Sequence, residues 1–365
     1  MRQINVSEIK PGMILAEEIL SPKGQVLAER GTAINAQQLL HVSYYGIQQL
    51  WIQDEEDAIE QYQFDAPDEF IGETQSWRIK NSQEFAEFKR AYEKCANQLE
   101  QIVYDFVNKQ TPLKDDELLK EIHTVFDKHS TGLGIMAMML NIQELDTNTY
   151  KHSVNVAIIS RVCGSWLGIT DEKDLDVLTM CGLYHDIGKS LVPQEILTKP
   201  GQLNAEEYGR MAEHPLLGYN LLSDLPIDRR IKLAALQHHE RNDGSGYPYG
   251  LTKDFINKYS KIVAITDVYD AMTADRCYRA GICPFEVIAQ FQRQDQTKYD
   301  QSILQNFLQN IAESYIGTGV LLSDNSRGLI TLVKKNALSS PLVQLDNGEF
   351  VDLRERTDLY IRACI

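Results

Sequence analysis

Helical periodicity is clearest in residues 83–107. There the apolar side chains follow a 3-4-3-4-3-4 spacing, which indicates one continuous stripe along a helix. The stripe consists of Phe85, Phe88, Tyr92, Cys95, Leu99, Ile102 and Phe106. Such a stripe is typical of a helix that packs on its own domain. The same heptad spacing is what a coiled-coil seam requires, so a homodimer through this helix is the second interpretation.

Changes in this pattern divide the chain into four predicted parts. Residues 1–60 contain short apolar runs separated by Pro and Gly, which predicts a small β-rich N-terminal domain. Residues 61–111 join an acidic linker to the striped helix. Residues 112–315 are predominantly helical, and residues 316–365 return to short apolar runs between glycines, as in a β-rich tail. The expected fold class is therefore mainly α.

Composition is that of a globular protein without a membrane span. The chain has 365 residues, of which 43% are hydrophobic and 24% charged. Its longest apolar stretch, Ile135–Leu140, is far shorter than the roughly 20 residues that cross a bilayer. The N-terminus lacks the apolar core of a signal peptide. The six cysteines form neither a CxxC pair nor a compact framework, which favours reduced thiols in the cytoplasm.

The net charge of −16 argues against DNA, RNA or an anionic membrane as a partner. It also constrains any phosphate-bearing substrate. A protein this acidic has to concentrate positive charge locally, through bound metal ions or a few placed lysines and arginines.

Histidines are clustered in the helical part of the chain. Five of the eight histidines fall within 88 residues of one another. They are His152, His185, His214, His238 and His239. Each one alone is more often a surface or core residue than a ligand. Together with acidic neighbours on several helices, they are typical of how helical proteins build dinuclear metal sites.

The adjacent pair His185-Asp186 gives the strongest local signal. It follows an apolar helix and is itself followed by Gly188-Lys189. An imidazole and a carboxylate side by side can approach one cation or bridge two. Lys189 lies three residues beyond Asp186, so on a helix its ammonium group would point to the same side.

Asp267 follows the apolar run Ile262–Ile265, so its carboxylate emerges from a buried helix. An unpaired buried acid is costly, and a metal ion is a natural compensation; an N-cap or a surface acid is the alternative. Five histidines with Asp186 and Asp267 exceed the ligand set of a single zinc site. They fit two divalent ions, Fe or Mn first among them, that activate water and hold phosphoryl oxygens.

In this order the segments resemble the HD-GYP family, a subset of the HD phosphohydrolase superfamily. The resemblance spans roughly residues 125–310. It rests on HDIGK at 185–189, ILTKPGQL at 196–203, EHP at 213–215, HHERNDGSGYP at 238–248 and DVYDAMTADRCYR at 267–279. It implies a helical HD-type catalytic domain that hydrolyses cyclic di-GMP to pGpG or GMP through a metal-activated hydroxide.

The resemblance also implies a ligand set. One metal would be held by His152, His185, Asp186 and Asp267, and the second by His214, His238 and His239, with Asp186 bridging the two. Asp186 and Lys189 would be the catalytic residues.

Substrate phosphates would contact Lys189, Arg276 and Arg279. The two arginines are three residues apart and share a helical face, although two ordinary solvated arginines would have the same spacing. Tyr247 of the GYP tripeptide is a candidate for substrate binding or for packing in a rigid rim.

Two positions depart from the family pattern. Some relatives carry a Glu that helps to bind a third metal where this chain has Asn148, so two metals are expected. Cys277 and Arg279 stand where many relatives carry Pro and Lys. Arg279 keeps the positive charge, and Cys277 is expected to pack.

Other functions share these residues. Metals and phosphate-binding side chains contact the phosphodiester backbone, so the same site would serve cyclic GMP-AMP or a linear nucleotide. A scaffold that binds a cyclic dinucleotide without hydrolysing it is the third interpretation. A degenerate scaffold would be expected to lose metal ligands, and all seven are present here.

Overall fold

A computed structural model of the chain describes residues 2–5, 13, 15–17, 19–20, 26–28, 49–52, 75–126, 131–142, 149–199, 201–274, 281–294 and 297–365. The chain divides into two compact units, residues 1–72 and residues 73–365. In the first unit the described residues form two antiparallel pairs. Strand β1 (Arg2–Asn5) pairs with β4 (Gln49–Ile52), and β2 (Ile19–Leu20) pairs with β3 (Val26–Ala28).

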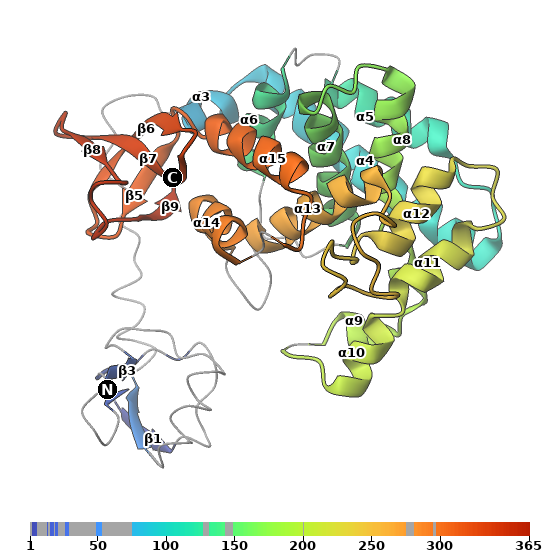
Figure 1. The fold of residues 1–365 in the computed structure, drawn as a ribbon, viewed down its shortest axis with the longest axis horizontal. Coiled ribbons are helices and arrows are strands. Elements are labelled where there is room, and N and C mark those ends of the chain that lie inside the picture. The colour runs from blue at the N-terminus through green and yellow to red at the C-terminus, as the bar shows by residue number, and fades with distance from the viewer. Residues whose placement is uncertain are drawn as a thin grey trace. The chain divides into compact units, whose positions relative to one another are not determined.

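The second unit is mainly helical, as the sequence predicted, and ends in a small sheet (Figure 1). Its first helices are α3 (Gln75–Lys80), α4 (Gln83–Lys109), α5 (Asp115–Phe126), α6 (Gly132–Ile142), α7 (Thr149–Trp166) and α8 (Glu172–Tyr184). A 3₁₀ helix, η2 (Ile187–Leu191), is followed by α9 (Gln194–Leu197), α10 (Ala205–Met211), α11 (His214–Leu222), α12 (Arg229–Gln237), α13 (Lys258–Thr273), α14 (Pro284–Gln294) and α15 (Gln301–Ser314). No helix among the described residues is both long and apolar enough to cross a membrane.

The stripe on α4 is buried within this chain. Its members from Phe85 to Ile102 are all buried in the core of the second unit, and Phe106 packs against that core. Helix α4 contacts α5 and α7 along this face. The spacing therefore marks intramolecular packing, the first of the two interpretations. The homodimer seam through 83–107 receives no support, because its apolar face is already covered.

Helices α7, α8 and α13 form the centre of the unit. Helix α7 buries four consecutive residues, Val156–Ile159, whose side chains are about 100° apart around its axis. A helix that is apolar on all sides has to be surrounded by others. Contacts with α4, α6, α8, α13 and α15 surround it here. The polar side chains at the ends of these central helices are consequently held in a rigid, water-poor environment.

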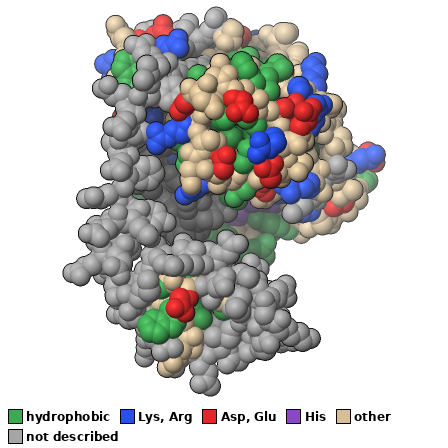
Figure 2. Space-filling model, turned by 90° about the vertical axis from the view of Figure 1, so that its left-hand side faces the viewer, with side chains coloured by type: hydrophobic (Ala, Val, Ile, Leu, Met, Phe, Trp, Pro, Cys, Tyr) green, Lys and Arg blue, Asp and Glu red, His purple; other side chains and the backbone are tan. Residues whose placement is uncertain are grey.

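The C-terminal residues form the expected β-rich tail. Five antiparallel strands form one sheet, in which the order of neighbouring strands is β8-β7-β6-β5-β9. They are β5 (Gly319–Leu322), β6 (Arg327–Lys334), β7 (Ala337–Leu345), β8 (Phe350–Asp352) and β9 (Ile361–Cys364). The sheet contacts α14 and α15. On the face drawn in Figure 2, acidic and basic side chains are interspersed. Ion pairs in the sheet region include Lys334–Asp352 and Arg356–Asp358.

Candidate metal centre

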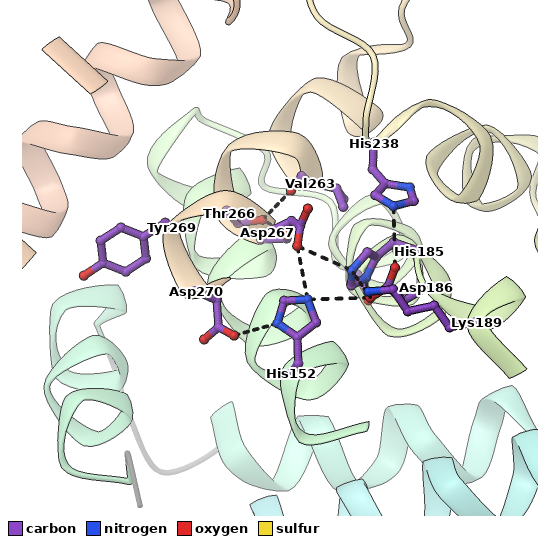
Figure 3. Close-up of polar contacts among 12 residues, drawn as sticks. His152, His185, Asp186, Lys189, His238, Val263, Thr266, Asp267, Tyr269 and Asp270 are labelled. Carbon is purple, nitrogen blue, oxygen red and sulfur yellow. Dashed lines mark hydrogen bonds and ion pairs between the residues drawn. The ribbon is translucent and has the colours of Figure 1, made fainter. Parts of the chain in front are cut away.

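The seven predicted ligand residues lie in, or directly beside, six helical elements. His152 lies in the first turn of α7, and His185 directly follows α8. His214 begins α11, and the pair His238-His239 follows α12. Asp186 precedes η2, and Asp267 lies in the middle of α13. The structure brings all seven together, and Figure 3 shows several of them converging from separate helices.

Their ligand atoms form two groups, and within each group the atoms lie within 4.8 Å of one another. The first group, which we call the Asp267 group, consists of His152, His185 and Asp267. The histidine-rich group consists of Asp186, His214, His238 and His239.

Asp186 connects the two groups through its two carboxylate oxygens. Its Oδ1 atom lies 3.2 Å from Nε2 of His214 and 3.6 Å from Nε2 of His238. Its Oδ2 atom lies 3.3 Å from Nε2 of His185 and 3.7 Å from Nε2 of His152. One oxygen therefore faces each group, which is the arrangement of a carboxylate that bridges two cations.

Two buried polar atoms of this centre have no hydrogen-bond partner among the described residues. They are Nε2 of His185 and Oδ1 of Asp186, and His185 is completely buried. A buried polar atom without a partner costs free energy unless something else satisfies it. The His185 nitrogen belongs to one group of candidate ligand atoms, and the Asp186 oxygen faces the other. Donors of this kind fit divalent metal ions, so the residues present can hold the cofactor that the sequence implies.

The outer nitrogens of three rings are bonded to backbone carbonyls. The Nδ1–H group of His185 donates to Gly182 O at 2.6 Å, and that of His214 donates to Met211 O at 2.7 Å. The Nδ1–H group of His238 donates to Ala234 O and Ala235 O, each at 3.0 Å. A carbonyl only accepts, so each of these rings carries its proton on Nδ1 when it is neutral. The Nε2 lone pairs are then directed into the centre, as metal ligation requires.

Charges in the centre are strongly coupled. Burial opposes ionisation of Asp186, but Lys189 and His185 outweigh it and hold the pKa of that carboxyl well below its usual range. Burial lowers the pKa of His152, yet the carboxylates of Asp267 and Asp270 outweigh it and raise that pKa to about 9. Burial lowers the pKa of His238 to about 4, so its imidazole is neutral at pH 7 and available as a ligand.

Lys189 lies where the sequence predicted, on the same side as the HD pair. Its ammonium group donates to Oδ2 of Asp186 at 2.5 Å, and a quarter of its side chain is exposed. Gly188 allows this geometry, because an added Cβ there would meet His214 O at 2.0 Å and Gly218 N at 2.5 Å. The backbones of η2 and α11 therefore approach closely beside the site.

The GYP loop forms one wall of the centre. The ring of Tyr247 stacks on His239 with centroids 4.6 Å apart and planes inclined by 20°. Its backbone N–H donates to His239 O at 3.2 Å. Tyr247 thus contacts a candidate ligand directly, and its role in substrate binding stays a prediction.

Two acidic residues beside the site were not singled out from the sequence. Glu240 is buried and accepts hydrogen bonds from the backbone N–H groups of Tyr249 and Leu251, each at 2.8 Å, which fixes the GYP loop. Asp270 is also buried and bonds to His152. Their positions, next to His239 and one helical turn after Asp267, were the available signals.

Four residues named from the sequence lie outside the described residues. They are Asn148, Arg276, Cys277 and Arg279. The phosphate-binding role of the two arginines therefore stays a prediction, as does the absence of a third metal at Asn148.

Residues 135–303 match the HD domain family. The matched residues include all seven clustered side chains, as well as Lys189 and Tyr247.

Three curated relatives are named as phosphodiesterases of cyclic dinucleotides. The chain is 31% identical over 230 residues to the cyclic di-GMP phosphodiesterase PA4108 of Pseudomonas aeruginosa, covering 63% of this chain and 54% of that protein. It is 33% identical to the cyclic di-GMP phosphodiesterase response regulator RpfG of Xanthomonas campestris, covering 51% and 49% respectively. It is 38% identical to the 3′3′-cGAMP-specific phosphodiesterase 1 of Vibrio cholerae, covering 43% and 36%.

The chain thus spans about half the length of the first two relatives and about a third of the last. Among solved structures it is similar to Bd1817, a HDG"Y"P protein from Bdellovibrio bacteriovorus. The TM-score is 0.49 at 19% identity, covering 84% of this chain and 97% of that one.

Proposed function

We propose that this chain is a dinuclear metal-dependent phosphodiesterase that hydrolyses cyclic di-GMP to pGpG, GMP or both. The observation that carries the proposal is the convergence of seven ligand side chains in two groups that meet at Asp186. The named activities of the relatives support the substrate class.

The residues present suit two divalent cations. His152, His185 and Asp267 would hold one, and His214, His238 and His239 the other, with Asp186 between them. When bound, such ions lower the pKa of a water molecule and neutralise phosphoryl oxygens. A ligand set of imidazoles and carboxylates suits Fe or Mn, which are our candidates for the metal.

The chain's own residues supply the other requirements. Asp186 provides a negative charge shared by both positions, and its low pKa keeps it ionised at neutral pH. Lys189 lies at the border between the buried carboxylate and solvent. Its ammonium group can therefore attract a substrate phosphate toward the centre, a role that Arg276 and Arg279 are proposed to share.

Cyclic GMP-AMP is a second candidate substrate. The Vibrio cholerae relative, which is 38% identical over 157 residues, is named as specific for 3′3′-cGAMP. The ligands described above contact phosphate and water, not bases, so they do not distinguish the two dinucleotides. A non-catalytic binding scaffold is less well supported, because no ligand of the set is missing.

The four-part division of the chain and its place in the cytoplasm belong to the same proposal. The thiols of Cys95, Cys163 and Cys181 are free and buried in the helical unit. A reducing compartment suits such thiols.

The experiment is a turnover assay across cyclic dinucleotides. Protein reconstituted anaerobically with Fe²⁺ or Mn²⁺ is incubated with cyclic di-GMP, 3′3′-cGAMP and cyclic di-AMP, and products are separated by chromatography. Asp186→Ala is the comparison, because it removes the charge shared by both positions. We expect hydrolysis of cyclic di-GMP by the native chain and at least a 100-fold loss in the variant. Hydrolysis of 3′3′-cGAMP alone would favour the second substrate, and bound metal without any turnover would favour the scaffold.

A further inference from the structure

The side chain of Asp270 lies behind the His152 ring, on the side opposite the other acids of the centre. Its Oδ2 atom is 2.7 Å from Nδ1 of His152. Nε2 of the same ring faces Asp267 at 3.1 Å. Figure 3 shows the imidazole between the two carboxylates. Because the ring has one nitrogen toward each acid, a hydrogen bond from Nδ1–H to Asp270 leaves Nε2 directed at the centre.

No lysine or arginine of the described residues forms an ion pair with Asp270, although its side chain is only 3% exposed. A buried carboxylate without a compensating cation is costly. Asp270 and Asp267 are three residues apart on α13, so one helical face carries both acids to the two sides of His152. The imidazole is thus the group in this part of the structure that compensates Asp270.

His152 differs in this respect from three other rings of the centre. Their Nδ1–H groups donate to neutral backbone carbonyls, as described above for His185, His214 and His238. A hydrogen bond to a carboxylate is charge-assisted and makes the opposite nitrogen a stronger donor to a cation. The Asp267 group therefore has Asp267 on the Nε2 side of the His152 ring and Asp270 on the Nδ1 side. The histidine-rich group has Asp186 as its acid.

We propose that Asp270 is a positioning residue. It fixes the His152 ring, so that the Asp267 group binds its metal ion more tightly than the histidine-rich group does. This inference rests on the proposed function only in requiring that the cluster binds divalent metal. Asp270 acts through His152 and touches no reacting atom. Its replacement should therefore affect one metal position much more than the other.

The test is a titration of metal-free protein with Mn²⁺ under anaerobic conditions, followed by calorimetry and by the electron paramagnetic resonance of free Mn²⁺. For Asp270→Asn we expect one Mn²⁺ to bind with native affinity and the other about 10–100-fold more weakly. In a His152→Ala background the same replacement should produce less than a twofold further change, since the ring through which it acts is gone.

Asp176 provides a matched control. Its Oδ1 atom lies 2.7 Å from Nε2 of His123, the same separation as in the Asp270–His152 pair. Arg161 also donates to that oxygen at 2.7 Å, so the charge there is already compensated. Asp176→Asn should leave both Mn²⁺ binding steps unchanged, and thermal unfolding of each variant verifies that it is folded.

The outcomes separate this inference from the proposed function. Equal weakening of both Mn²⁺ steps, native affinity at both, or an undiminished effect in the His152→Ala background would each overturn the positioning role. A native chain that binds two Mn²⁺ ions but hydrolyses no cyclic dinucleotide would refute the proposed activity and leave the Asp270 result to stand. A native chain that binds no Mn²⁺ would overturn both.

Discussion

Gly188→Ala tests whether the close approach of η2 and α11 holds the metal centre together. The added Cβ would lie 2.0 Å from His214 O and 2.5 Å from Gly218 N, whereas real Cβ atoms essentially never approach closer than 3.0 Å. Both contacts are backbone atoms, which cannot rotate away as a side chain does. The two elements therefore have to separate by about 1 Å, the difference between 3.0 and 2.0 Å.

That separation acts directly on the ligands. Asp186 precedes η2 and His214 begins α11, and their facing atoms are 3.2 Å apart. A displacement of this size typically costs about 100-fold in rate at a catalytic centre. Overpacking also costs about 1–3 kcal/mol of stability, which lowers the Tm by several degrees.

The assay compares Gly188→Ala with Gly209→Ala. Gly209 lies in α10, and its added Cβ would meet nothing within 4 Å. The control should bind metal normally and gain up to ~1 kcal/mol, because Ala restricts the unfolded chain more than Gly does. Metal content, turnover and thermal unfolding are measured for both. A Gly188→Ala protein with native metal affinity and native Tm would refute the packing argument.

Further predictions concern the metals, the loop and the arginines. Chelation should lower the Tm and re-addition of Mn²⁺ should restore it, because bound cations compensate the buried acids; a Tm insensitive to chelator would count against a metal site. In metal-free protein the pKa of His152 is about 9, so Mn²⁺ affinity should rise from pH 7 to pH 9 and then level off, as titration at each pH would reveal. Glu240→Gln removes one of two anchors of the GYP loop and should cost ~1–3 kcal/mol in thermal unfolding. Arg276→Ala or Arg279→Ala should raise the KM for substrate and leave metal content intact; loss of metal would contradict a substrate role.

The sequence predicted the composition of the metal centre because its chemistry is local to each residue. Imidazoles and carboxylates such as His185 and Asp186 identify themselves by type, and a helical chain has few other uses for so many. The structure confirms that the seven candidates converge. Whether they bind metal is still a prediction.

Asp270 was missed for a physical reason. Its importance depends on a partner 118 residues earlier, His152, which becomes its neighbour only when α13 packs on α7. The spacing from Asp267 shows that the two acids share a helical face, but spacing alone does not tell which group that face meets. Glu240 presents the same difficulty, because its partners are backbone N–H groups of a folded loop.

The stripe on α4 illustrates a different limit. Spacing from Phe85 to Phe106 fits both an intramolecular core and a dimer seam, because both require the same apolar face. The choice depends on whether other helices of the chain have apolar faces to cover it. Here α5 and α7 supply them, so Leu99 and its neighbours are buried without a second chain.

The proposed function places two cations on either side of the Asp186 carboxylate. Anomalous scattering from crystals of the Mn²⁺-loaded protein measures this directly. This dinuclear arrangement predicts two peaks, one among His152, His185 and Asp267, and the other among the remaining histidines of the centre. A single peak, or peaks distant from Asp186, would contradict it.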